Sequence, residues 1–148
     1  AAAGEDSAEL AGRIGDGLIS TAPKRDTVET FEKSGGSGPR YGQLTVCYDT
    51  DEARARRTAL MQWPNAAIPG QLGQELPLPS HFEQAAKTIA EDSIAESVVC
   101  GPDPAKHIEQ ISAFAEAGFD HVYVHQIGTA QEEFIEFYAA EIIPKVAA

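Results

Sequence analysis

The sequence predicts an α/β fold with parallel strands, because short strand patterns alternate with amphipathic helix patterns along most of the chain. Parallel strands joined through helices need right-handed crossovers, and the helices then cover the sheet. The 148 residues, of which 43% are hydrophobic, suffice for one domain with a buried core. About three or four strands can be counted. A complete eight-stranded barrel takes about 250 residues, so the count alone leaves a doubly wound sheet of about five strands open.

The first third of the chain is predicted to form a helix, a strand and a second helix. Apolar residues recur at helical spacing over 6–14, and the glycines of 15–17 end that helix. A short buried strand follows at 18–21. The second helix is expected over 24–33, and a Gly-rich and Ser-rich surface loop closes it at 34–39.

The middle of the chain begins with a β-rich stretch at 41–48. Asp51 can cap the helix that follows, which is expected to reach Trp63. The segment 64–79 is rich in Pro and Gly, breaks both periodicities and is too long for a simple connector, so it is expected to be functional or mobile. Trp63, Tyr48 and Tyr123 are interpreted as core packing.

The last part of the chain repeats the order of strand, turn and helix. Ser80 and Glu83 have the spacing of a capping box, which predicts a helix start at Ser80. The expected elements are a helix over 80–89, an extended piece at 98–100, a helix from Pro104 to Gly118, a strand at 121–125 and a helix over 132–146.

Acidic residues dominate the charge, with 23 Asp and Glu against 11 Lys and Arg and a formal net charge of -12. Such a chain repels nucleic-acid phosphates and anionic membrane surfaces, so neither is expected as a partner. No window approaches the roughly 20 apolar residues that span a bilayer, and the start lacks the basic region of a signal peptide. Cys47 and Cys100 lack the spacing of a zinc site or a disulfide framework. We therefore expect a soluble, cytoplasmic protein without a metal.

Three segments resemble one enzyme family in the same order along the chain. They are Ala2–Gly4 followed by Ala11–Thr21, then Val99–Pro104, and then Ala117–Gly128. These segments resemble F420-dependent glucose-6-phosphate-dehydrogenase-like enzymes within the luciferase-like monooxygenase superfamily, and the resemblance is weakest at 29–43 and 64–79. It implies that residues 1–148 form the carboxy-terminal half, about strands five to eight, of a (β/α)8 TIM-barrel domain.

The resemblance implies a cofactor site at the start of the chain. Ala3, Gly4, Asp6 and Ser7 occupy the positions that hold the phosphate-bearing tail of the deazaflavin coenzyme F420 in this family. A glycine lets the backbone approach an anion closely, and the start of a helix favours negative charge. Glu5 and Asp6 depart from this pattern because carboxylates repel phosphate. The alternative is that these acids merely cap a helix.

The resemblance also implies substrate-binding residues. Thr21 and Lys24 match the Thr and Lys that hold the substrate phosphate in sugar-phosphate-oxidising members. A Lys and an Arg complete that site in those members, but residues 73–74 are Gly and Gln here and Ser97 stands at the Arg position. Glucose 6-phosphate is therefore not the expected substrate, and a solvated Lys24 is the alternative. His125 ends the predicted last strand, at the barrel edge where active sites are built, and is expected to line the substrate pocket.

By resemblance, the intact enzyme is an oxidoreductase that transfers a hydride between the deazaflavin and an alcohol, an aldehyde or another small organic substrate. The family's proton-transferring His and its acidic partner come from early strands, so no catalytic residue is predicted in this chain. The chain alone is therefore expected to be inactive. A half barrel exposes sheet edges and an apolar interior, so we expect it to pair with the missing amino-terminal half or with a second copy as a homo-oligomer.

Two further interpretations stay open at this stage. The first is a fragment of an FMN-dependent luciferase-like monooxygenase, because phosphate binding through backbone donors does not distinguish FMN from F420. The second is a non-enzymatic α/β assembly module, which would be indifferent to both cofactors. A binding titration with each cofactor separates the three interpretations.

Overall fold

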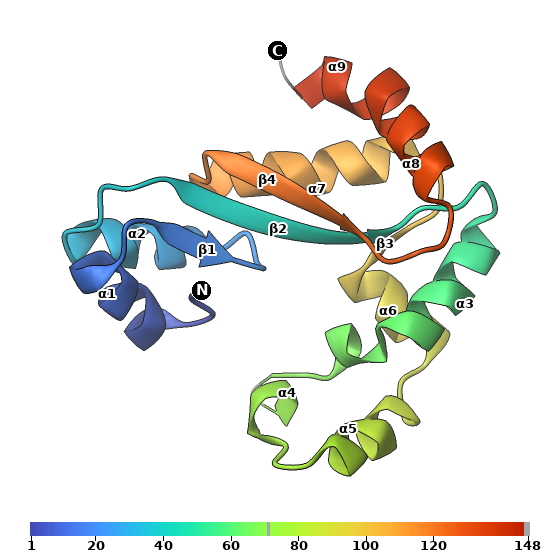
Figure 1. Ribbon diagram of the computed structural model, residues 1–148, viewed down its shortest axis with the longest axis horizontal. Coiled ribbons are helices and arrows are strands. Elements are labelled where there is room, and N and C mark those ends of the chain that lie inside the picture. The colour runs from blue at the N-terminus through green and yellow to red at the C-terminus, as the bar shows by residue number, and fades with distance from the viewer. Residues whose placement is uncertain (71, 147–148) are drawn as a thin grey trace. The chain divides into compact units, whose positions relative to one another are not determined.

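The computed structural model describes residues 1–70 and 72–146, and these form two compact units (Figure 1). The first unit contains Ala1–Leu44, Pro104–His125 and 142–146, and the second contains Thr45–Asp103 and Gln126–Glu141. Each unit is therefore assembled from segments that lie far apart in the sequence. None of the helices within the described residues combines the length and apolar character that crossing a membrane requires.

In the first unit, helices and strands alternate along the chain, as predicted. Its elements are α1 (Glu5–Ile14), β1 (Leu18–Ser20), α2 (Arg25–Lys33), the first part of β2 (Arg40–Cys47), α7 (Pro104–Ala117), β4 (His121–Gln126) and α9 (Ile143–Val146). The turn that ends α7 was correctly predicted at Gly118, whose φ of 98° lies in the left-handed region that favours glycine.

The second unit continues from the end of β2 and is mainly helical. Its elements are α3 (Glu52–Gln62), the 3-10 helix η1 (Pro64–Ala67), α4 (Leu72–Glu75), α5 (Pro79–Ala86), α6 (Glu91–Ser97), β3 (Val99–Cys100), α8 (Gln131–Phe137) and most of the π-helix η2 (Tyr138–Ile142). Asp51 caps α3 as predicted, because its carboxylate accepts a hydrogen bond from the Arg54 N–H at 3.1 Å.

The second unit also corrects three predictions. The segment 64–79 is not wholly irregular, since η1 and α4 lie within it. The capping box at Ser80 is wrong, because α5 begins one residue earlier at Pro79, which suits a first helical position, and Leu78 is its N-cap. Helix α6 was not predicted, and its buried Ile94 packs in the core of this unit.

Parallel pairing of the strands confirms the predicted α/β class. In the first unit, β1 pairs with the start of β2, so that Ile19 lies beside Tyr41. In the second unit, the end of β2 pairs in parallel with β3, with Cys47 beside Cys100. Strand β4 also pairs with β2, and the two strands run side by side in Figure 1.

One face of the sheet in the first unit is covered by helices. Leu18 and Ser20 of β1 and Leu44 of β2 are buried on this face, together with Phe31 of α2 and Phe114 of α7. Side chains alternate between the two faces along a strand, so these buried positions fix which face carries the core. The Phe114 ring meets Phe119 edge-on, with the ring centroids 5.3 Å apart.

The opposite face of this sheet carries exposed apolar side chains. Ile19 is 49% exposed and Tyr123 is 63% exposed, although both lie in the interior of strands. The prediction of core packing was therefore wrong for Tyr123, because the described elements of the first unit leave most of its side chain exposed. It was also wrong for Trp63, which is 44% exposed at the end of α3, and right for the buried Tyr48.

A close contact at Gly42 generates a stability prediction. A Cβ atom at this position would lie 2.4 Å from the Cδ1 atom of Phe114, which is itself buried. We expect Gly42→Ala to lower the free energy of unfolding by about 1–3 kcal/mol, because the core cannot take the extra carbon without moving the ring. Chemical denaturation measures the effect. Gly4→Ala is the control, because a Cβ there meets nothing within 4 Å; equal stability of the two variants would contradict the prediction.

An ion pair joins the start of β2 to the start of β4. The Arg40 guanidinium donates to both carboxylate oxygens of Asp120, at 2.9 Å from Nε and 2.7 Å from a terminal nitrogen, and it also pairs with Glu32. The Arg40 backbone N–H donates to the same carboxylate at 2.8 Å. These hydrogen bonds lower the pKa of Asp120 to about 2.

The lowered pKa of Asp120 predicts a pH dependence of stability. A carboxyl group whose folded pKa lies below its unfolded value of 3.8 stabilises the fold above that value. Its contribution is lost as the pH falls from about 4 to about 2. Both side chains are partly exposed, so solvent screening limits this contribution to about 1 kcal/mol. Urea unfolding of Asp120→Asn at a series of pH values should show a deficit near neutrality that disappears in acid, whereas Asp16→Asn should show none.

Candidate functional site

The start of α1 and the turn after β1 lie at the same edge of the sheet. The Ala2 N–H donates to the carbonyl oxygen of Ile19 at 2.8 Å, so the first residues run beside β1. Gly4, which follows Ala2, and Lys24, which follows β1, line the same pocket, so the two segments lie close together. This local pairing brings Gly4 near Lys24.

Gly4 is the N-cap of α1, and Ser7 completes the cap. The Ser7 hydroxyl accepts hydrogen bonds from the N–H groups of Ala3 and Gly4, each at 3.2 Å, and donates to the Gly4 carbonyl at 2.9 Å. Ser7 therefore organises the turn. The N–H groups of the first helical turn, at Glu5 and Asp6, point out of the end of the helix, where they and the helix dipole favour an anion.

A pocket of about 410 Å³ lies between the starts of α1 and α2, and we call it the α1–α2 pocket. It is lined by Ala3, Gly4, Glu5, Lys24, Asp26, Thr27, Glu29, Thr30 and Lys33. A Cβ atom at Gly4 would meet nothing within 4 Å, so the space above its backbone is open. A ligand can therefore approach the main chain at Gly4.

The charges of the α1–α2 pocket are mixed. Lys33 forms an ion pair with Glu29 at 2.9 Å, and this pairing raises the pKa of Lys33 and lowers that of Glu29. Lys24 is exposed and makes no ion pair with any residue that the structure describes. The acids Glu5 and Asp26 also line the pocket. Lys24 is thus the cation with its ammonium group available to a ligand there.

The structure brings together some of the predicted site residues. Ala3, Gly4 and Lys24 line the α1–α2 pocket, although the sequence had assigned Lys24 to the substrate. Asp6 and Ser7 do not belong to this lining: Asp6 is exposed at the helix start, and the Ser7 hydroxyl is engaged in the cap. Thr21, exposed just after β1, lies outside the lining as well.

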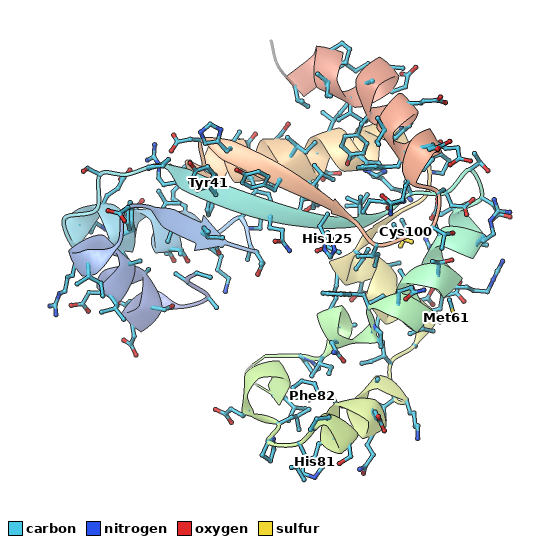
Figure 2. The ribbon with its side chains drawn as sticks, in the orientation of Figure 1. Tyr41, Met61, His81, Phe82, Cys100 and His125 are labelled. Atoms are coloured by element: carbon cyan, nitrogen blue, oxygen red, sulfur yellow. The ribbon has the colours of Figure 1, made fainter. Side chains whose placement is uncertain are left out.

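His125 lies near the carboxyl end of β4, as predicted. Its side chain is partly buried and its Nδ1 atom is buried. Figure 2 labels it beyond the middle of the strand, whereas Tyr41 lies near the start of β2. His125 does not line the α1–α2 pocket.

Sequence reasoning missed the contribution of α2 to the pocket. Thr27 and Thr30 line it, and Thr27 is buried while its neighbour Asp26 is exposed. Lys24, Thr27 and Thr30 are spaced by three residues, which places them along one side of a helix. That spacing was present in the sequence and could have added both threonines to the predicted site.

In the second unit, the Gln126 amide has a structural role. Its Oε1 atom accepts a hydrogen bond from the Tyr48 N–H at 2.8 Å, and its Nε2 atom donates to the Tyr48 carbonyl at 3.2 Å. The buried Tyr48 ring stacks on Phe137 with centroids 4.7 Å apart, and burial raises the pKa of Tyr48. Gln126 therefore ties the end of β4 to the residue after β2.

Asp49 and Cys47 of the second unit are each held in one protonation state near neutral pH. Asp49 accepts a hydrogen bond from Arg54 Nε at 2.7 Å, and this lowers the pKa of Asp49, so its carboxylate stays ionised. Burial raises the pKa of Cys47 to about 12, which leaves the thiol protonated and unreactive. Within residues 1–70 and 72–146, no cluster of three His, Cys, Asp or Glu could hold a metal ion.

Comparison with known proteins identifies the family. The family model described as luciferase-like monooxygenase matches residues 1–121, most of the chain. The α/β elements and the resemblance in sequence agree with this match. The chain therefore belongs to the luciferase-like monooxygenase family, as the resemblance indicated.

The curated relatives of this chain include F420-dependent enzymes. The chain is 31% identical to an F420-dependent glucose-6-phosphate dehydrogenase of Beutenbergia cavernae, over 100% of this chain and 48% of the relative. It is 27% identical to the enzyme of the same name from Nakamurella multipartita, over 99% of this chain and 47% of the relative. The chain thus spans about half the length of the curated relatives it matches.

Solved structures share the fold. An F420-dependent secondary alcohol dehydrogenase, in complex with an F420-acetone adduct, matches 97% of this chain and 46% of its own, with a TM-score of 0.76 and 24% identity. The coenzyme F420-dependent tetrahydromethanopterin reductase from Methanopyrus kandleri matches 97% of this chain and 49% of its own, with a TM-score of 0.66 and 20% identity. At these identities the likeness is one of fold.

The two hydrogen bonds of Gln126 predict a measurable loss of stability. We expect Gln126→Leu to lower the free energy of unfolding by about 1–3 kcal/mol, because the backbone groups of Tyr48 lose their partners. Thermal and urea unfolding measure the change. Gln62→Leu, at an exposed position in the last turn of α3, is the matched control. Unchanged stability of Gln126→Leu would refute the structural role.

Proposed function

We propose that this chain is the carboxy-terminal half, about strands five to eight, of a (β/α)8 barrel oxidoreductase that uses coenzyme F420. The F420-dependent names of the curated relatives support this proposal, as does the match to about half the length of each. The single observation on which the proposal depends is the α1–α2 pocket, which Gly4 and Lys24 both line at the start of a helix. We take residues 1–148 to be one part of a single barrel domain.

The donors of the α1–α2 pocket fit a phosphate group. The open space above Gly4 admits an anion to the helix start, and the Lys24 ammonium can donate charge-assisted hydrogen bonds. Ala3 and Gly4 would lie against the cofactor's phosphate-bearing tail, while their own N–H groups donate to Ser7 and fix the turn. The N–H groups of Glu5 and Asp6 at the helix start would then be the backbone donors to the tail. The Glu5 carboxylate would repel the phosphate, so the Glu5 side chain has to turn toward solvent. When bound, F420 supplies a carbon that accepts or gives up a hydride.

The chain's own residues would bind and orient, and the other half would supply proton transfer. Thr21 follows β1 and His125 nears the end of β4, so each lies at the carboxyl edge where barrel enzymes bind substrate. We therefore assign both to the substrate side and none to catalysis. On this proposal the isolated chain binds cofactor but does not turn over substrate.

A small alcohol, aldehyde or related organic molecule fits the proposal better than a sugar phosphate. Lys24 lines the same pocket as Ala3 and Gly4, so it is available to the cofactor tail rather than to a substrate phosphate. Ser97, which replaces an anion-binding Arg expected from the resemblance, is exposed and uncharged. Too few cations then remain for a substrate phosphate.

Cofactor titration tests the proposal. We expect Lys24→Ala to weaken F420 binding about tenfold, because one charge-assisted hydrogen bond to the tail is lost. Binding of the deazaflavin without its phosphate tail should be unaffected by the substitution. Fluorescence titration of the folded chain measures both affinities, and Lys87→Ala, at an exposed position far along the sequence, is the control.

Three results would contradict the proposal. Equal F420 affinity of the Lys24→Ala variant and the parent chain would show that the α1–α2 pocket does not bind the phosphate-bearing tail. Tighter binding of FMN than of F420, with the same dependence on Lys24, would favour the FMN-dependent monooxygenase. Indifference to both cofactors would favour a non-enzymatic assembly module.

A further inference from the structure

A second pocket lies within the second unit, where α6 packs against η1. Its volume is about 590 Å³, and its lining comes from η1, the turn after η1, Ile89 and α6. We call it the α6 pocket. Small-molecule sites in proteins have volumes of about 300–1,000 Å³, so this pocket is large enough for a small ligand. It includes part of the Pro-rich and Gly-rich segment 64–79, to which the proposed function gives no role.

One part of the lining of the α6 pocket is apolar. Ile68, which follows η1, is only 8% exposed, and Ile89 is half-buried. Ala66 and Ala67 of η1 also line the pocket and pack against the hydrophobic core of the second unit. The apolar body of a small ligand can therefore rest on a surface that the core supports.

The other part of the lining is a polar side of α6. Ser93, Glu96 and Ser97 are spaced by three and four residues, so they lie on the same side of the helix. The buried Ile94 and Val98 hold a different side of this segment in the core. The pocket thus offers two hydroxyl oxygens and one carboxylate beside an apolar surface.

The charges of the α6 pocket favour a cation. Its described lining contains no Lys, Arg or His, and Glu96 forms no ion pair with any residue that the structure describes. The Glu96 carboxylate and two serine hydroxyls can accept hydrogen bonds, which matches the three N–H donors of a protonated amine. The net charge of -12 attracts cations to the chain as well. A carboxylate ligand would instead be repelled by Glu96.

We propose that the α6 pocket binds a small organic ammonium ion with an apolar body. The ammonium group donates to Glu96, Ser93 and Ser97, and the apolar body lies against Ile68 and Ile89. This ligand site goes beyond the proposed function and does not depend on it, because its residues all belong to the second unit, whereas the α1–α2 pocket belongs to the first. An alcohol of the same shape keeps the apolar contact but loses the ion pair.

Three probes of matched shape test the proposal: benzylammonium, benzyl alcohol and benzoate. NMR titration of the nitrogen-15-labelled chain at neutral pH measures the affinity for each. We expect benzylammonium to bind about fivefold more tightly than benzyl alcohol, which is the effect of a solvent-exposed ion pair. Benzoate should bind more weakly than both. The amide signals that shift should include those of Ile89, Ser93 and Glu96.

Substitutions separate the ion pair from the apolar contact. Glu96→Gln should remove the preference for benzylammonium and leave the affinity for benzyl alcohol unchanged. Ile89→Ala should weaken the binding of both probes to a similar degree, because it removes the contact that they share. Glu83→Gln is the matched control, at an exposed position on α5 outside the lining, and it should keep the preference. The NMR spectrum of each variant shows whether its fold is kept.

Four results would overturn the proposal. They are a lack of saturable benzylammonium binding, equal affinity for benzoate and benzylammonium, a preference that survives Glu96→Gln, and shifted signals confined to residues outside the α6 pocket. F420 titration of the same samples reports on the α1–α2 pocket separately. Failure of the proposed function would therefore leave the outcome at the α6 pocket unaffected.

Discussion

Strand β2 pairs with β1, β3 and β4, and this pairing determines which side chains form the core and which are exposed. Its first residues hold β1 in register and its last residues hold β3, while β4 pairs with it as well. Once this register is set, alternation along each strand decides which side chains meet the helices and which do not. Gly42 faces Phe114 and the next residue but one, Leu44, is buried, so Tyr41 has to lie on the other face. The packed core and the exposed apolar side chains on the opposite face are therefore two consequences of one register.

The hydrogen bond between Ala2 and β1 also contributes to the α1–α2 pocket. Because Ala2 is bonded to Ile19, the turn that begins α1 and the turn that follows β1 leave the sheet at one edge. A helix start with an open glycine and a lysine from the next turn then meet without any long-range folding event. The pocket lies wholly within the first unit, and so do the exposed side chains of Ile19 and Tyr123. Both features thus depend on one compact set of contacts.

Local patterns in the sequence predicted most elements of the first unit, because the residues that begin and end a helix act over only a few positions. Helix α1 and the turn at Gly118 followed from helical spacing and glycine alone. Competing local signals explain the errors elsewhere: Pro79 begins α5 ahead of the apparent cap at Ser80, and α6 is too short for its period to be recognised. The exposure of Tyr123 could not be predicted from its strand pattern. The sequence of a strand does not show which of its faces other elements of the same unit cover.

The acidic character of the chain and an anion-binding pocket are compatible because they act over different distances. A net charge of -12 repels an approaching phosphate, but salt screens exposed charges beyond about 8 Å at physiological ionic strength. Hydrogen bonds from Lys24 and the first turn of α1 act within about 3 Å and are not screened in the same way. The nearest opposing groups are Glu5 and Asp26, and both are exposed enough for water to weaken their repulsion. Glu29 and Lys33 neutralise each other, which leaves Lys24 as the cation of the pocket that can pair with a ligand beside Glu5 and Asp26.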